Sequence, residues 1–372
     1  MLSVHEISDF GEFEGLRDVW NQILWKSKDN DVFSTWEWLW CWWKHFGKER
    51  SLRLLIAREK DEIFGIAPLM LSKYSFLHVG KLTKIEFVGA PHSDYNSFIL
   101  LKKPHECLKV FLDRLVELSD WDLLDLRDVR EGSASAVALQ SMCNSETLNL
   151  KLRVGTVCPY ISLPNSVEAF THVLSRNMRK NLRRRMRKLG EKYKVEVKTH
   201  QDFGSVEEAM KTFFELHQKR WISKGKSGAF TSRAFHDFHL ELAKVFNNNG
   251  WLALHFLTAN DKPVAAVYSF DYYGKKYGYL TGFDPDFGPY GVGNLLKLHV
   301  VEECIKKGFR EYDLMRDLEL YKAEWATGVR RNFVVRMLLK GLSAKMYDWA
   351  MQNSFSLFFV NKFGMHFGLQ HD

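Results

Sequence analysis

Two segments of the sequence, two hundred residues apart, have the same pattern of apolar and polar residues. Residues 51–73 (SLRLLIAREKDEIFGIAPLMLSK) and 251–273 (WLALHFLTANDKPVAAVYSFDYY) each indicate a strand, a polar turn and a second strand. When the two are aligned, the turns coincide, and Leu52, Leu54 and Asp61 stand opposite Leu252, Leu254 and Asp261. Each hairpin also follows an aromatic-rich stretch with a helical pattern. This repeated order favours an internal duplication, and it predicts two related α/β domains.

The remaining elements fit this division. The 372 residues are 46% apolar, enough for two domains with sizeable cores. We expect an N-terminal domain at 1–160, a second domain at 161–341 and a helical tail at 342–372. The strands outnumber what one layer of helices could cover, so we expect mixed central sheets with helices packed on both faces.

Composition excludes several classes of protein. No apolar run reaches the roughly 18 to 20 residues that span a bilayer, and the N-terminal residues lack the basic start and apolar stretch of a signal peptide. The sequence therefore predicts a cytoplasmic protein. The five cysteines are scattered and form no CxxC pair, so we expect buried thiols and no metal site. A net charge of +8 favours anionic partners.

The positive charge is concentrated in one segment, SRNMRKNLRRRMRKLGEKYK at 175–194. Its basic residues recur at intervals of three and four, which aligns them on one face of a helix. They are Arg176, Arg179, Lys180, Arg183 and Arg187. Arginine suits bidentate phosphate recognition better than lysine does, so the stripe indicates a phosphate-binding face. A solvated surface helix explains the same pattern.

A glycine-rich turn, FDPDFGPYGVGN at 283–294, joins a predicted strand to a predicted helix. A helix N-terminus has unpaired N–H groups and a partial positive charge, so a turn without bulky side chains can bind a phosphate there. Gly291 and Gly293 would permit that approach, and Val292 and Asn294 lie beside them. Alternatively, the glycines only allow a tight turn and Asn294 caps the helix. The turn matches neither a Walker A loop nor a GxGxxG fingerprint.

Polar residues lie along the end of the next predicted strand and in the turn after it, in REYDLMRDLELYKAEWA at 310–326. They lie where neighbouring connections of an α/β sheet diverge, which is the usual place for a ligand. The residues are Glu311, Asp313, Arg316, Tyr321 and Lys322. An ordinary salt-bridged turn is the alternative.

Several stretches together resemble the CelD-like acetyltransferase family of the GNAT superfamily, whose tandem arrangement is similar to that of the FemAB aminoacyltransferases. They include VFSTWEWLWCWWKHF, HSDYNSFIL, the basic helix, FFELHQKRW, GYLTGFDP and EYDLMRDLELYKAEWA, and they cover roughly residues 15–340. The most specific piece is the pattern of Asp313, Arg316, Tyr321, Lys322 and Trp325. The resemblance implies two tandem GNAT-like domains.

The resemblance also implies transfer of an acyl group, most often from acyl-CoA, to an amine in surface-polysaccharide or cell-envelope biosynthesis. Such chemistry needs a base for the amine and an acid for the leaving group. The catalytic candidates are Asp313 or Glu311 as base, Tyr321 as acid, and Asp94 and Tyr95 from the first domain for amine activation. The candidates for binding the donor are Gly291, Val292, Gly293, Asn294, Arg316 and Lys322, and those for binding substrate are Arg176, Arg179, Arg183 and Trp221.

Two departures from the family pattern leave two candidates for the acyl donor, acyl-CoA and aminoacyl-tRNA. Gly288 stands where an acetyl-CoA loop usually has Gln or Arg, and Asp317 stands where relatives commonly have glycine. FemAB relatives lack that loop and use aminoacyl-tRNA, whose phosphates an arginine-rich helix would also suit. The anionic ligand is therefore CoA or tRNA, and we expect no stable DNA binding. A non-catalytic accessory role in polysaccharide export is the third possibility. The aromatic tail is compatible with peripheral membrane contact.

Overall fold

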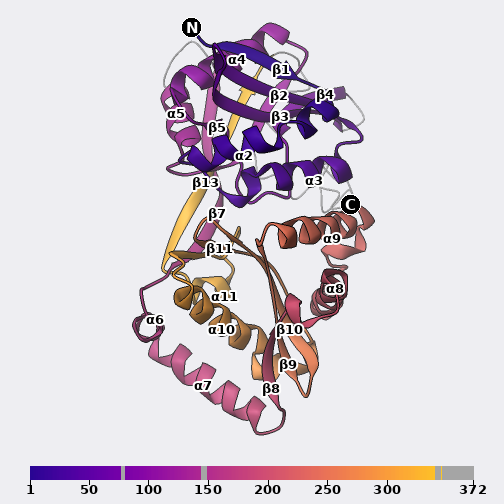
Figure 1. Ribbon diagram of the computed structural model, residues 1–372, viewed down its shortest axis with the longest axis vertical. Helices are drawn as coiled ribbons and strands as arrows, with labels where there is room; N and C mark the ends of the chain where they lie inside the picture. The colour runs from indigo at the N-terminus through magenta and orange to yellow at the C-terminus, as the bar shows by residue number, and fades with distance from the viewer. Residues whose placement is uncertain (77–79, 144–148, 340–344, 346–372) are drawn as a thin grey trace. The chain divides into compact units, whose positions relative to one another are not determined.

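The computed structural model describes residues 1–76, 80–143, 149–339 and 345. The chain forms two compact units (Figure 1). One consists of Met1–Thr156 and the described residues from Arg331 onward, and the other is Val157–Arg330. The chain thus enters the second unit within strand β7 (Leu150–Ser162) and leaves it within β13 (Gly328–Leu338).

The first unit is built on a mixed sheet with the strand order β1-β2-β3-β4-β6-β13, and β5 pairs with β3. Its strands are β1 (Ser3–Ile7), β2 (Arg50–Glu59), β3 (Glu62–Phe76), β4 (Gly80–Phe87), β5 (Ile99–Leu100) and β6 (Leu123–Arg130). Its helices are α1 (Phe10–Glu14), α2 (Arg17–Lys26), α3 (Trp36–Phe46), α4 (Pro104–Leu118) and α5 (Ala134–Cys143). The sequence analysis placed residues 161–341 in the second domain, whereas β13 pairs antiparallel with β6 of the first unit from Asn332 to Leu338.

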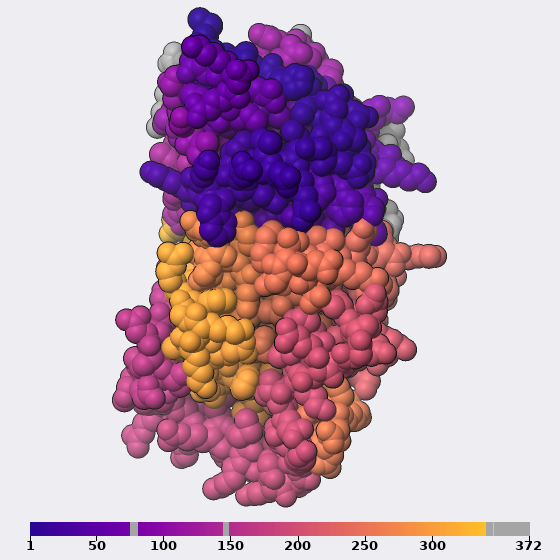
Figure 2. All heavy atoms as spheres, viewed as in Figure 1, coloured from indigo at the N-terminus to yellow at the C-terminus, as the bar shows by residue number. Residues whose placement is uncertain are grey.

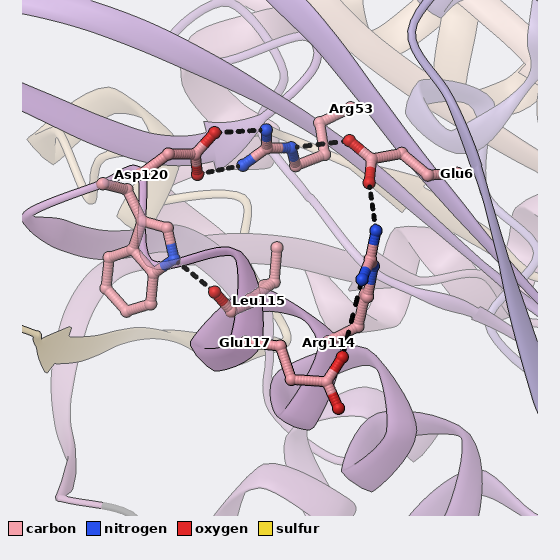
Figure 3. Close-up of polar contacts among 7 residues, drawn as sticks. Glu6, Arg53, Arg114, Leu115, Glu117 and Asp120 are labelled. Atoms are coloured by element: carbon pink, nitrogen blue, oxygen red, sulfur yellow. Dashed lines mark hydrogen bonds and ion pairs between the residues drawn. The ribbon is translucent and has the colours of Figure 1, made fainter.

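Buried arginine Arg53 of β2 holds several elements of this unit together (Figure 3). Its guanidinium forms two hydrogen bonds of 2.6 Å to the carboxylate of Asp120, after α4, and a third of 3.1 Å to Glu6 of β1. Arg114 of α4 reaches the other oxygen of Glu6 at 3.5 Å. The hydrogen bond from Arg53 lowers the pKa of Asp120, as expected for a bidentate pair.

We expect Arg53→Met to destabilise the first unit by about 1–3 kcal/mol, because two carboxylates would lose a charged partner. Thermal and urea unfolding would measure the loss. The matched control is Arg114→Met, since the Arg114 side chain is 39% exposed and should contribute at most about 0.5 kcal/mol. Equal effects of the two substitutions would contradict this account.

The second unit has the strand order β7-β12-β11-β10-β9-β8. Its strands are β8 (Val195–Thr199), β9 (Leu252–Ala259), β10 (Lys262–Tyr272), β11 (Lys275–Phe283) and β12 (Glu311–Asp313), besides the second half of β7. Its helices are α6 (Val167–Val173), α7 (Arg176–Gly190), α8 (Val206–Ile222), α9 (Arg233–Asn248), α10 (Val292–Lys306) and α11 (Leu320–Ala323).

Helices cover both faces of the part of the sheet that belongs to the second unit, as the sequence predicts. Strand β10 is buried on both sides, and its alternating residues face different helices. Ala265 and Val267 pack in one core with α10, whereas Tyr268 and Phe270 contact aromatic rings of α8 and α9. Figure 1 shows α8 and α9 on one side of β9–β11 and α10 on the other.

The two hairpins recognised in the sequence have the same register. Glu59 pairs with Glu62 in the first hairpin, and Ala259 pairs with Lys262 in the second, two hundred residues later in both strands. The turn residues Lys60 and Asn260 also share a left-handed backbone, with φ of 55° and 50°. The α/β fold class, the hairpins and the long helices of the prediction are therefore confirmed.

The sequence analysis missed β7 and the short strand β1. In the part of the chain that the structure describes, no helix is both long enough and apolar enough to cross a bilayer. The predicted helical tail at 342–372 and its membrane contact lie outside the described residues, apart from position 345.

Candidate active site

Strands β11 and β12 diverge in the second unit. They pair in parallel only from Lys275–Glu311 to Tyr277–Asp313. Beyond this point β11 continues to Phe283 beside β10, while the chain after β12 follows β7, with Leu314 N–H donating to the Pro159 carbonyl at 2.9 Å. The sheet therefore opens along β11 after Tyr277, which is the place for a ligand in an α/β fold.

The glycine-rich turn leads from β11 to α10. Gly291 has a φ of 62°, a conformation that favours glycine, and α10 begins at the next residue without a side-chain cap. A Cβ on Gly293 would meet no atom within 4 Å, so the first turn of α10 is open to a ligand. A Cβ on Gly291 would instead meet the side chain of Arg185 from α7, which places a guanidinium beside this helix end.

Asn294 does not cap α10. The alternative in which this residue caps the helix is therefore not what the structure has. Its side-chain oxygen accepts a hydrogen bond of 3.3 Å from the indole N–H of Trp325, just after α11. Trp325 is buried and stacks on Phe170 of α6 at 6.5 Å. This contact fixes α11 against the first turn of α10, so Tyr321 and Lys322 are held near the same helix end.

Tyr321 and Lys322 are half-buried residues of α11. Burial, with a smaller effect of Glu319, raises the pKa of Tyr321 to about 12, so its phenol remains protonated at neutral pH. The ammonium of Lys322 donates to the carbonyl of Arg316, which fixes the turn between β12 and α11. A protonated phenol and a fixed cation thus stand on one short helix.

Arg220 of α8 joins this group from the other face of β11. It donates to the Thr281 carbonyl at 3.2 Å and also to the Thr281 hydroxyl. Its guanidinium lies over the ring of Tyr321, 5.7 Å from the centroid. The sequence analysis chose the neighbouring Trp221, whose indole N–H instead donates to His217 within α8 at 2.8 Å.

Lys297 of α10 is the second residue that the sequence analysis missed. It is 4% exposed, and its ammonium nitrogen has no hydrogen-bond partner among the described residues. The nitrogen lies over the rings of Tyr321 and Trp325, 4.6 Å and 5.5 Å from their centroids. The ring of Tyr321 therefore lies close to two cationic side chains, Arg220 and Lys297.

Glu311 and Asp313, the two candidate bases, are engaged by Arg330. Its guanidinium donates to Glu311 at 3.0 Å and 2.5 Å and to Asp313 at 2.7 Å. Burial raises the pKa of Glu311, but Arg330 and Lys275 outweigh it and the pKa is lowered. Asp313 is fully buried and also accepts from the Met315 backbone. This geometry fits ion pairs that hold β12 in place, and we assign neither carboxylate as a base.

The basic helix is present as α7, anchored by buried Leu182 and Leu189. Among the described residues, basic side chains on its exposed face line an open hollow of about 620 Å³. The lining residues are Arg176, Arg179, Lys180, Arg183, Arg184 and Arg187. Figure 2 shows the magenta to pink side chains of this segment at the surface.

The remaining candidates, Asp94 and Tyr95, are buried in the first unit, where the Asp94 carbonyl accepts from Asn332 at 2.9 Å.

Comparisons with known proteins give one family match and several similar folds. The family model of the acetyltransferase (GNAT) domain matches residues 176–323. The fold is similar to that of FemX, with a TM-score of 0.64, 12% identity and coverage of 93% of this chain and 99% of that one. The L-PGS structure from Bacillus licheniformis has a TM-score of 0.53, 12% identity and coverage of 89% and 94%.

A third structure is the C-terminal domain of a putative lysylphosphatidylglycerol synthetase from Agrobacterium fabrum. It has a TM-score of 0.53, 10% identity and coverage of 92% of this chain and 96% of that one. At such identities the structural likeness shows the fold alone. No curated protein matches the sequence. Within the described residues, no group of His, Cys, Asp and Glu side chains could hold a metal ion.

The family match spans α7, the glycine-rich turn, α10 and α11 up to Ala323, and thus most of the site described above. Residues 176–323 therefore match the family model of the acetyltransferase (GNAT) domain, within a chain that is similar in fold to FemX.

Proposed function

We propose that the chain transfers an acyl group from acyl-CoA, with acetyl-CoA as the first donor to test, to an amine acceptor. The observation that carries the proposal is the opening along β11 after Tyr277, together with the uncapped start of α10, to which the glycine-rich turn connects β11. Backbone N–H groups and the helix dipole at that start favour a phosphate. Arg185 beside Gly291 adds a positive charge. The resemblance to CelD-like proteins suggests an acceptor from surface-polysaccharide or cell-envelope biosynthesis.

In this proposal the acyl chain lies in the opening between β11 and the segment after β12. The amine nitrogen attacks the acyl carbon, and the bond from that carbon to the leaving sulfur breaks. Tyr321 donates its proton to the leaving group, since its raised pKa keeps it protonated before the reaction. The proton lost from the amine nitrogen restores the phenol. Arg220 and Lys322 supply positive charge near the oxygen on which negative charge develops.

A donor panel tests the proposal directly. The purified protein would be incubated with acetyl-CoA, longer acyl-CoAs and bulk aminoacyl-tRNA, each with a mixture of amine acceptors. Release of free CoA that depends on the acceptor, followed by mass spectrometry of the product, would support the proposal. Absence of transfer from every acyl-CoA would refute it.

Aminoacyl-tRNA is the second candidate donor, and the cationic hollow on α7 is the observation that favours it. The hollow is open and lined by six basic residues, as would suit the backbone of a nucleic acid. Transfer from aminoacyl-tRNA with a steep dependence on salt, and none from acyl-CoA, would select this alternative. Failure of both donors would favour an accessory protein.

The hollow also yields a prediction for donor binding. We expect the double substitution Arg179→Gln with Arg183→Gln to raise KM for the donor about threefold to tenfold, with kcat unchanged, because these residues would contact phosphates distant from the reacting carbon. Lys188→Gln is the matched control, since Lys188 is exposed on α7 but does not line the hollow. If the control raised KM as much as the double variant, binding would depend on general charge instead of this face.

A further inference from the structure

Lys297 occupies a position where an apolar side chain would be expected. It lies on the face of α10 that also carries Val300, Val301 and Cys304, all of which are buried in the core of the second unit. A buried ammonium without a hydrogen bond is costly, and replacing it with an apolar residue of similar size should stabilise the fold. Its presence there therefore calls for a role other than packing.

The surroundings of Lys297 converge on Tyr321. The lysine nitrogen lies on the face of the Tyr321 ring at 4.6 Å, and the charged groups that influence it come from two neighbouring elements. They are Arg220 of α8, Lys322 and Glu324 of the α11 segment, and Glu319 just before it. Burial, followed by the positive charges of Lys322 and Arg220, lowers the pKa of Lys297 to about 7. Its charge therefore changes near neutral pH.

We propose that Lys297 is a positioning residue that acts through Tyr321: its positive charge stabilises the phenolate that forms when Tyr321 gives its proton to the leaving group. This inference rests on the proposed role of Tyr321 in acyl transfer. A unit charge over the ring of Tyr321, 4.6 Å from its centroid and in a partly buried site, is worth enough to raise the acidity of the phenol about tenfold to a hundredfold. The proton balance is unchanged, since the amine proton restores the phenol.

The sign of the pH dependence follows from this role. Below pH 7 Lys297 is charged and Tyr321 is the better acid, whereas above pH 7 Lys297 becomes neutral and that assistance is lost. At saturating substrates, kcat should therefore include a factor that falls about tenfold as pH rises through about 7. Ionisation of the amine acceptor affects the wild type and all variants equally. Dividing the pH profile of kcat for one protein by that for another therefore isolates the contribution of Lys297.

The test compares Lys297→Arg and Lys297→Met with the wild type in the full chain. Arginine keeps its charge, so the ratio of wild type to Lys297→Arg should be near one at pH 6 and fall about tenfold by pH 8.5. Lys297→Met should be about tenfold slower than wild type at pH 6 and nearly equal to it at pH 8.5. Lys306→Met, an exposed position at the end of the same helix, should leave the profile unchanged.

A second measurement follows the titration of Lys297 in the wild-type protein. In protein labelled with [ε-¹³C]lysine, the Lys297 resonance, assigned by its absence in Lys297→Arg or by its contact with aromatic rings, should titrate near pH 7. A midpoint above pH 9 would overturn the inference, as would a Lys297→Met profile parallel to that of wild type. Failure of the proposed function is distinguishable, because the wild type would then transfer no acyl group from any donor.

Discussion

Tyr321→Phe should lower kcat for acyl transfer by about 100- to 1,000-fold while leaving KM for the donor nearly unchanged. The substitution removes only the hydroxyl, so the ring keeps its contacts with Arg220 and Lys297. A general acid placed at the leaving group contributes a factor of this size. The effect should be larger with an oxygen-ester donor than with a thioester, because an alkoxide is a stronger base than a thiolate. Steady-state kinetics with both donor types would measure it.

The control for this variant is Tyr273→Phe. Tyr273 lies in the same unit, in the turn between β10 and β11, and is 40% exposed. It should change kcat by less than twofold. A Tyr321→Phe enzyme within twofold of wild type, with an unaltered melting temperature, would exclude Tyr321 as the acid.

Periodicity and turn chemistry were sufficient to predict the elements that hold the site. The hairpins, α7, α10 and the glycine-rich turn follow from patterns local to the sequence, and the repeat two hundred residues apart indicated two related domains. Strand β7 was missed because only a few of its residues are buried and because it contains Pro159, a residue that argues against a central strand in the sequence. Its place in the sheet depends on pairing with β12, which lies more than a hundred residues later.

The interaction partners of individual side chains could not be predicted from such local patterns. Glu311 and Asp313 resemble catalytic carboxylates in sequence, but Arg330 neutralises both, and only the packing of β12 shows which cation reaches them. The unusual position of Lys297, by contrast, could have been recognised in the sequence. A lysine within the apolar face of a predicted helix conflicts with the pattern around it, and such conflicts often mark functional sites.

Gly282→Ala should destabilise the second unit by about 3 kcal/mol or more, which corresponds to a fall in melting temperature of roughly 6–12 °C. A Cβ at this position of β11 would lie 2.7 Å from the Leu216 carbonyl carbon and 2.8 Å from the His217 Cα, both backbone atoms of α8. Neither can rotate away, so α8 must move off the sheet. Calorimetry would measure the loss. Gly288→Ala is the matched control, since a Cβ there would meet nothing within 4 Å.

The same substitution links packing to activity. Arg220 of α8 donates to Thr281, the residue before Gly282, so displacement of α8 would withdraw the guanidinium from the ring of Tyr321. Any folded fraction of Gly282→Ala should therefore show a reduced kcat at temperatures well below its melting point, whereas Gly288→Ala should not. A Gly282→Ala protein with wild-type stability would show that α8 packs less closely on β11 than the structure indicates. If the destabilised Gly282→Ala variant kept the wild-type kcat, Arg220 would have no part in the chemical step.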